Sequence, residues 1–140
     1  MYSNPSNEEI EKILKEAKTI AVVGLSDKSD RTSYQVSKVM QDAGYKIIPI
    51  NPTVDKVLGE KAYPSLLDIE DDIKIDIIDV FRRSELLPEV AKEAVQTNAG
   101  VFWAQQGLYN EEAYDILKKE NKTVIMDLCI KVAHSVLVKK

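Results

Sequence analysis

The sequence predicts a three-layer α/β fold, in which a five-stranded, mostly parallel sheet with the strand order 3-2-1-4-5 lies between helices on both faces. Short apolar runs suited to buried strands alternate with amphipathic segments of helical period along most of the chain. The first run, Thr19 to Val23, ends at Gly24 and is followed by a polar turn and a helical segment. A strand, a glycine turn and a helix in this order are typical of the opening unit of a Rossmann-like nucleotide-binding sheet.

Each element follows from a local pattern. Ser6, placed three residues before Glu9, fits a capping box and predicts an N-terminal helix at about 6–18. Gly44 predicts the end of a helix that begins near Thr32, because glycine tolerates the backbone that follows a helix. Apolar runs predict five strands, at 19–23, 46–50, 75–81, 100–104 and 123–127. Helical periodicity predicts two further helices, at 85–97 and 111–121.

The segment from Pro52 to Lys74 is rich in turn-forming residues. We expect a crossover with little regular structure and one short helix that starts near Ser65. No internal repeat or low-complexity linker interrupts the alternation of strands and helices.

Length and composition limit the possible functions. With 140 residues, 44% of them hydrophobic, we expect a single domain over residues 1–140. A formal net charge of −4 argues against nucleic acid as a partner, because affinity for a polyanion depends on a basic surface. No apolar run approaches the ~20 residues that cross a bilayer, so we expect no membrane span. A single cysteine and a polar N-terminus without signal-peptide features favour a cytoplasmic protein.

The loop after the first strand is a candidate phosphate site. Ligands of such sheets bind outside the carboxyl ends of the strands, where the strand order reverses, which predicts a site between the first and fourth strands. The loop lacks the second and third glycines of the G-x-G-x-x-G fingerprint, so hydroxyls, backbone amides and the helix start would have to hold a pyrophosphate. The candidate contacts are Gly24, Leu25, Ser26, Arg31, Thr32 and Ser33. In the alternative interpretation, Thr32 or Ser33 only caps the helix and Arg31 is only solvated.

The second strand ends at Asn51-Pro52, where an NAD site usually has an acidic residue for the ribose. A neutral asparagine with Lys46 and Lys56 nearby would accept a ribose that carries an extra phosphate, whereas a carboxylate would repel it. This pattern disfavours NAD. Asn-Pro is also a good turn, and both lysines could be ordinary surface charges.

The chain resembles the stand-alone CoA-binding domain proteins, which are similar to the nucleotide-binding domain of the succinyl-CoA synthetase alpha subunit. The resemblance extends from Ile20 to about Leu137 and depends on several signatures in one order and spacing. These signatures are Val23-Gly-Leu-Ser26, Arg31-Thr-Ser-Tyr34, Gly44-Tyr45, Pro49-Ile-Asn-Pro52, Gly59, Tyr63-Pro-Ser-Leu66, Asp79-Val-Phe-Arg-Arg-Ser-Glu85, Trp103-Ala-Gln-Gln-Gly107 and Asp127-Leu-Cys-Ile130.

The resemblance implies that coenzyme A or an acyl-CoA binds at the carboxyl edge. It implies that Gly24 and Ser26 lie at the pyrophosphate and that Asn51 and Pro52 lie beside the adenosine. The remaining implied contacts are Phe81 and Arg82 at the adenine or pantetheine wall, and Gln105 and Gly107 along the arm. Of the pair Arg82-Arg83, we expect only Arg82 to face the ligand, because neighbouring side chains at a strand end point to opposite sides. Alternatively, both arginines pair with Glu85 and Glu89 at the surface.

No catalytic constellation or metal site is recognisable, and we expect a protein that is not an enzyme and acts as a carrier or sensor. The single histidine, His134, falls in an apolar C-terminal segment and is interpreted as part of a final helix. Cys129 follows the fifth strand and is either an inert apolar residue or a thiol close to that of the CoA arm. Two alternatives remain, an NAD(H)-binding redox-sensing module and an interaction subunit of a multi-chain acyl-CoA ligase.

Overall fold

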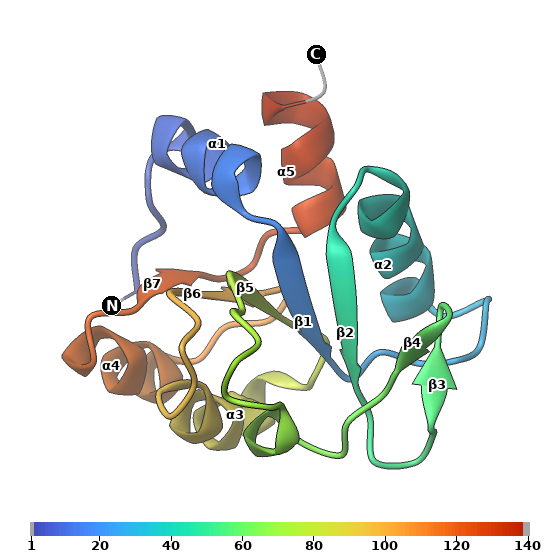
Figure 1. Ribbon diagram of the computed structural model, residues 1–140. Coiled ribbons are helices and arrows are strands. Elements are labelled where there is room, and N and C mark those ends of the chain that lie inside the picture. The colour runs from blue at the N-terminus through green and yellow to red at the C-terminus, as the bar shows by residue number, and fades with distance from the viewer. Residues whose placement is uncertain (1, 139–140) are drawn as a thin grey trace.

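The computed structural model describes residues 2–138 and contains a five-stranded sheet whose strands are all parallel (Figure 1). The predicted α/β class and the predicted number of strands in the sheet are confirmed. The strands are β1 (Thr19–Val23), β2 (Lys46–Ile50), β5 (Ile77–Val80), β6 (Val101–Ala104) and β7 (Thr123–Ile125).

The predicted strand order is wrong. The observed order is β2-β1-β5-β6-β7, which is 2-1-3-4-5 when these five strands are counted along the chain. The third strand therefore lies beside β1, with Ile20 opposite Ile77, instead of beyond β2. Asp76 supports this pairing, because its carboxylate accepts the backbone N–H groups of Lys18 and Thr19 at 2.8 and 3.0 Å. The point where the order reverses consequently lies between β1 and β5.

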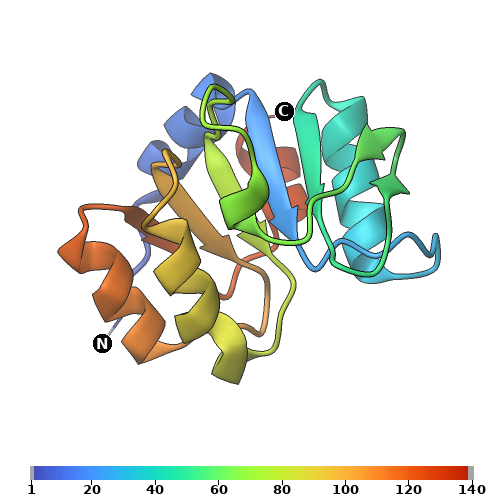
Figure 2. The same ribbon diagram turned by 60° about the horizontal axis from the view of Figure 1, so that its bottom comes forward.

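Helices cover both faces of the sheet. The helices are α1 (Asn7–Glu16), α2 (Thr32–Asp42), α3 (Leu87–Ala94), α4 (Glu111–Lys119) and α5 (Ile130–Leu137). Figure 2 shows α3 and α4 in front of the sheet and α1, α2 and α5 behind it. Ser6 caps α1 as predicted, since its side chain accepts the N–H of Glu9. In the described part of the chain, no helix combines the length and the apolar character that crossing a membrane would require.

Two hydrophobic clusters, one on each face, hold these layers together. Ile78 and Val80 of β5 belong to the cluster that includes residues of α3 and α4, whereas Ile77 belongs to the one that includes residues of α1, α2 and α5. This alternation follows from the period of two along a strand. Trp103 is fully buried in β6, and its indole N–H donates to the carbonyl of Leu128 at 2.8 Å.

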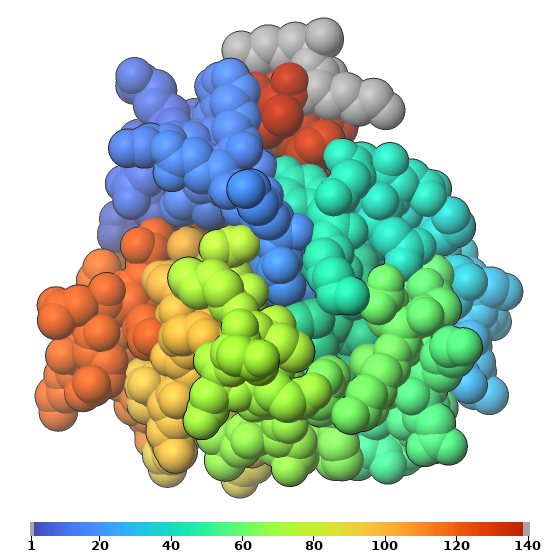
Figure 3. Space-filling view, viewed as in Figure 1, coloured from blue at the N-terminus to red at the C-terminus, as the bar shows by residue number. Residues whose placement is uncertain are grey.

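The crossover from β2 to β5 contains more regular structure than predicted. A two-stranded antiparallel hairpin is formed by β3 (Lys56–Val57) and β4 (Glu60–Lys61). Its turn residues, Leu58 and Gly59, both have positive φ, 54° and 77°, as in the tight turns that suit twisted strands. The predicted short helix is present as the 3₁₀ turn Leu66–Asp68, and Ser65 caps it. In Figure 3 the green crossover covers the lower front of the molecule.

Candidate functional site

The loops that leave the carboxyl ends of the strands line two cavities that share one residue. The larger, of about 660 Å³, is lined by residues that include Thr32, Phe81, Gln105, Gly107 and Cys129. The smaller, of about 200 Å³, is lined by residues that include Pro52, Pro64, Ser65, Glu89 and Glu93. Arg82 lines both cavities and therefore marks the boundary between them.

Gly24 turns the chain at the end of β1. Its φ is +85°, and its N–H donates to the carbonyl of Ile50 at 3.0 Å. A Cβ atom at this position would lie 2.5 Å from the carbonyl oxygen of Phe81, a contact that real Cβ atoms essentially never make. Glycine is thus required here because the chain after β5 packs directly against the loop after β1.

Ser26 and Ser33 organise the first loop. The backbone N–H of Ser26 donates to Ser33 Oγ at 3.0 Å, and Ser26 Oγ accepts the N–H of Lys28 at 3.1 Å. Each hydroxyl acts as an acceptor in these bonds, Ser33 is buried, and neither serine is among the residues that line the two cavities. The loop is therefore already shaped before any ligand binds.

The other candidates of this loop divide into surface and core residues. Arg31 and Thr32 are exposed at the start of α2, where unpaired backbone N–H groups favour anions. Arg31 makes no side-chain capping bond, and Thr32 lines the larger cavity. Leu25 is fully buried, so its side chain belongs to the core. Of the predicted contact at Leu25, only one through its backbone atoms is compatible with this burial.

Asn51 joins the ends of β1 and β2. Its Nδ2 donates to the carbonyl of Leu25 at 2.9 Å, while its Oδ1 accepts both the N–H and the hydroxyl of Thr53. Its backbone N–H donates to the carbonyl of Tyr63 at 2.9 Å. Asn51 therefore shapes the rim, and the neighbouring Pro52 is exposed on the smaller cavity.

The two lysines that were predicted near Asn51 occupy different places. Lys46 is the first residue of β2, at the amino end of the sheet, and it forms an ion pair with Glu60 at 3.2 Å. Its predicted place at the carboxyl edge is wrong, because a side chain at the start of a five-residue strand lies a whole strand length from that edge. Lys56 is exposed on β3, in the hairpin that follows Asn51.

Both arginines after β5 face the larger cavity. We expected only Arg82 to face the ligand, but both arginines line this cavity, because β5 ends at Val80 and the alternation of side chains ends with it. Arg82 and Arg83 are exposed, and among the ion pairs of residues 2–138 neither arginine has a carboxylate partner. Two unpaired guanidinium groups make this part of the rim suitable for phosphate.

A buried carboxyl group lies beneath the larger cavity. Asp79, in β5, is 2% exposed, and Gln105, which follows β6, is 5% exposed. Nε2 of Gln105 donates a hydrogen bond to Oδ1 of Asp79. Burial raises the pKa of Asp79 to about 7, although the hydrogen bond from Gln105 favours the ionised form.

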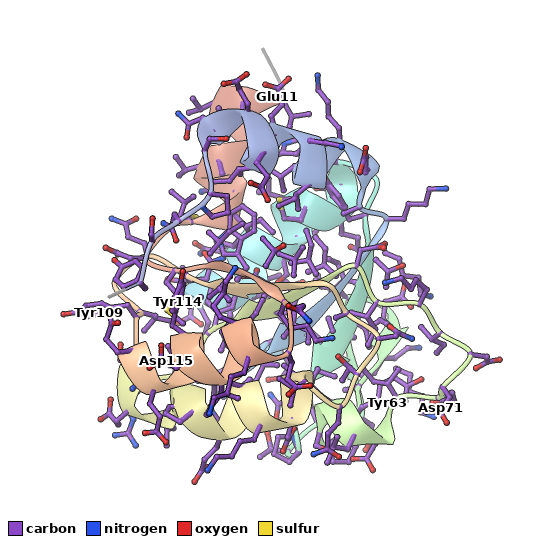
Figure 4. The ribbon with its side chains drawn as sticks, turned by 90° about the vertical axis from the view of Figure 1, so that its left-hand side faces the viewer. Glu11, Tyr63, Asp71, Tyr109, Tyr114 and Asp115 are labelled. Atoms are coloured by element: carbon purple, nitrogen blue, oxygen red, sulfur yellow. The ribbon has the colours of Figure 1, made fainter. Side chains whose placement is uncertain are left out.

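The loops after β5, β6 and β7 hold one another in place. Gly107, with φ of +85°, donates its N–H to Oδ1 of Asp127 at 2.6 Å. Ser84 accepts the N–H of Tyr109 at 3.1 Å and also bonds to Asn110. The ring of Tyr2 packs 5.5 Å from that of Tyr109, beside the start of α4; Figure 4 shows Tyr109 and Tyr114 together at this end. These contacts hold the wall of the larger cavity in place without a ligand.

The two reactive side chains considered from the sequence lie apart. Cys129 is half-buried at the start of α5 and lines the larger cavity. His134 lies further along α5, with its ring 5.7 Å from that of Tyr45. Among the described residues, no three His, Cys, Asp or Glu side chains are grouped so that they could hold a metal ion.

Comparison with known proteins assigns the family. The family model described as the CoA binding domain matches residues 18–135. The chain belongs to the CoA-binding domain family. The predicted resemblance is thereby confirmed, and both cavities of this CoA-binding domain are lined by residues within the matched range.

Relatives of this CoA-binding domain include stand-alone proteins and much larger enzymes. YneT of Bacillus subtilis is 66% identical over 133 residues, which cover 95% of this chain and 97% of YneT. A hypothetical protein from Pyrococcus horikoshii is 34% identical with a TM-score of 0.90, covering 99% of each chain. The ADP-forming acetate–CoA ligase of Methanocaldococcus jannaschii is 33% identical over 123 residues, but these cover 81% of this chain and only 17% of the ligase.

The donor set of this CoA-binding domain fits its ligand class. CoA combines phosphate groups with a long arm that contains amides, and the rim offers unpaired arginines, a helix start and the polar Gln105. At the larger cavity, prediction from the sequence missed the lining residues Arg83, Gln106 and Leu108, and at the smaller cavity it named only Pro52 and Arg82 as contacts. Arg83 could have been found, because an adjacent pair of arginines after a strand was already visible.

Proposed function

We propose that this protein binds coenzyme A or an acyl-CoA at the carboxyl edge of its sheet without transforming it, and that it acts as a carrier or sensor of that ligand. The observation that supports this most strongly is the position of Arg82 between two adjoining cavities, within a chain of the CoA-binding domain family. A ligand with a pyrophosphate between an adenine ring and a long uncharged arm suits this arrangement.

The charges favour one orientation of the ligand. Glu89 and Glu93 line the smaller cavity and disfavour phosphate there, so that cavity would take the adenine beside Pro52, and the 3′-phosphate of the ribose would lie outside it, toward Lys56. The pyrophosphate would lie between Arg82 and the start of α2, where Thr32 and the backbone amides offer donors. The pantetheine arm would then extend along Gln105 and Gly107 toward Cys129.

The absence of catalysis is part of the proposal. His134 packs against Tyr45 and does not line either cavity of the carboxyl edge. Cys129 lines the larger cavity as a single thiol, and we assign it to the wall around the end of the arm.

A role as an interaction subunit of an acyl-CoA ligase is the second candidate. It is favoured by the similarity to ADP-forming ligases, in which the matched part is a small fraction of the enzyme. Such a role would require a separate chain with the catalytic groups. Co-purification of that chain with this protein from cells would support the second candidate over a free carrier or sensor.

Thermal unfolding with three ligands tests the proposal. At about a hundred times the dissociation constant, CoA should raise the midpoint by roughly 5–10 °C. Dephospho-CoA should raise the midpoint less, because it lacks the 3′-phosphate of the ribose, which we assign to Lys56. NADH should raise the midpoint least. Lys56→Ala should remove the difference between CoA and dephospho-CoA. Lys46→Ala is the matched control and should preserve that difference, since Lys46 lies at the other end of β2.

Each ligand comparison tests a separate assignment. Equal shifts from CoA and dephospho-CoA would contradict the role of Lys56 and leave CoA binding intact. A larger shift from NADH than from CoA would contradict the proposed function itself and favour the NAD(H) alternative.

A further inference from the structure

A buried ionisable group within a sheet calls for a physical explanation. Asp79 lies opposite Val22 of β1 and Trp103 of β6, near the carboxyl end of the central strand. An isolated carboxylate in such a place is strongly disfavoured, and an apolar residue would pack there without that penalty. The proposed function of CoA binding does not by itself use Asp79, because its side chain is covered.

The hydrogen bond of Asp79 determines the orientation of Gln105. Oδ1 of Asp79 accepts the Nε2 donor of Gln105. The amide of Gln105 then turns its oxygen away from Asp79. Among residues 2–138, Ser37 Oγ is the one fully buried side-chain polar atom without a hydrogen-bond partner. The amide oxygen of Gln105 also has no partner among these residues, so it is not fully buried, and we take it to be reachable from the larger cavity that Gln105 lines.

We propose that Asp79 is a positioning residue, which holds the amide of Gln105 with its oxygen toward the larger cavity, so that the cavity accepts an N–H group of the ligand. This inference rests on the proposed function, because the secondary amides of the CoA arm are N–H donors of this kind. A ligand arm without an N–H group would gain nothing from this oxygen. Asp79 thereby contributes to specificity without touching the ligand.

Protonation of Asp79 reverses the polarity of this wall. When the proton lies on Oδ1, the oxygen that faces Gln105, Asp79 becomes a donor toward the amide instead of an acceptor. The amide of Gln105 then rotates by half a turn and points its NH₂ group into the cavity, where it opposes the N–H of the ligand. Since burial raises the pKa of Asp79 to about 7, the accepting form predominates above that pH and the opposing form below it.

Other ionisable groups near this face have to be separated from Asp79. They are Arg82 and Arg83 after β5, Asp127 after β7, Cys129 and His134 of the α5 segment, Tyr34 of α2 and Tyr45 before β2. The phosphates of CoA titrate as well. All of these groups are the same in the wild type and in an Asp79 variant, so their effects cancel in the ratio of the two dissociation constants at each pH.

The test measures CoA binding by titration calorimetry from pH 5.5 to 8.5 for the wild type and Asp79→Asn. The asparagine keeps the size of the side chain but carries no negative charge, and with its Nδ2 toward Gln105 it donates to the amide, as protonated Asp79 does. The variant should bind CoA on the order of tenfold more weakly than the wild type at pH 8.5. The two constants should converge at pH 5.5, with the change centred near pH 7.

A second pair of variants keeps the inference falsifiable if Asp79→Asn perturbs the fold. Gln105→Met retains the length of the side chain without the amide, and adding Asp79→Asn to it should change CoA affinity less than twofold at every pH. A pH-independent ratio between the wild type and Asp79→Asn, or a full tenfold effect in the Gln105→Met background, would overturn the positioning role while CoA binding stands. If the wild type bound CoA at no pH in this range, the proposed function would be overturned, and this inference with it.

Discussion

Arg82→Ala should weaken CoA binding about ten- to a hundredfold while the fold remains intact. The guanidinium of Arg82 lies at the boundary of the two cavities and, within the described residues, has no carboxylate partner. Its removal would eliminate charge-assisted hydrogen bonds to a phosphate, each of which is typically worth about 1.5–3 kcal/mol. Since Arg82 is exposed, little packing is lost.

Titration calorimetry with CoA measures this effect, and two variants calibrate it. Arg83→Ala should have a smaller effect, because Arg83 lines only the larger cavity of the two. Lys92→Ala removes one exposed positive charge from α3 that lines neither cavity, and should leave affinity unchanged apart from a weak effect of net charge. If Arg82→Ala bound CoA as tightly as Lys92→Ala, the arginine would be only a surface charge.

Gly24→Ala should destabilise the protein by about 3 kcal/mol or more. The positive φ of +85° alone disfavours alanine by roughly 1–2 kcal/mol. The new Cβ would also lie 2.5 Å from the backbone oxygen of Phe81, so the ends of β1 and β5 would have to separate. Displacement at the point where the strand order reverses should weaken CoA binding as well.

Gly59→Ala is the matched control for this substitution. Gly59 also has a positive φ, +77°, but a Cβ there would meet nothing within 4 Å. The free energy of unfolding of the Gly59→Ala variant should therefore fall by only about 1–2 kcal/mol, because only backbone strain is added. Urea denaturation of both variants measures the difference. Equal losses would show that the close approach between Gly24 and Phe81 does not contribute to stability.

Local sequence patterns predicted most elements of this fold. The capping pattern at Ser6, the turn at Gly24 and the cap at Ser65 all depend on residues within a few positions of each other, and all three are present. The positions of the five sheet strands followed from apolar runs for the same reason. The carboxyl edge could then be predicted as the site, because parallel strands bring their ends together.

Features that depend on pairing over long distances were not predictable in this way. An apolar run identifies a strand but not its neighbour, so the place of β5 beside β1 was missed. The hydrogen bonds that Asp76 accepts from Lys18 and Thr19 support that pairing, and they join residues 58 and 57 positions apart, respectively. The hairpin turn at Leu58-Gly59 was missed because leucine is uncommon at a positive φ.

The candidate site shows the same division. Arg82, Gln105 and Gly107 were predicted from the resemblance to the CoA-binding domain proteins, in agreement with their places after strands, and the structure brings them together around one cavity. Lys46 was misplaced because its position at the start of a strand was not considered. The bond between Asp79 and Gln105 joins residues 26 positions apart and becomes visible only when β5 and β6 are aligned.

A crystal structure of the protein with CoA tests the central claim most directly. We expect adenine beside Pro52 in the smaller cavity, the pyrophosphate at Arg82 and the start of α2, and the arm along Gln105 and Gly107 in the larger cavity. Density for CoA at another place, such as the hollow of about 750 Å³ between α2 and α5, with the carboxyl edge empty at saturating ligand, would contradict the claim.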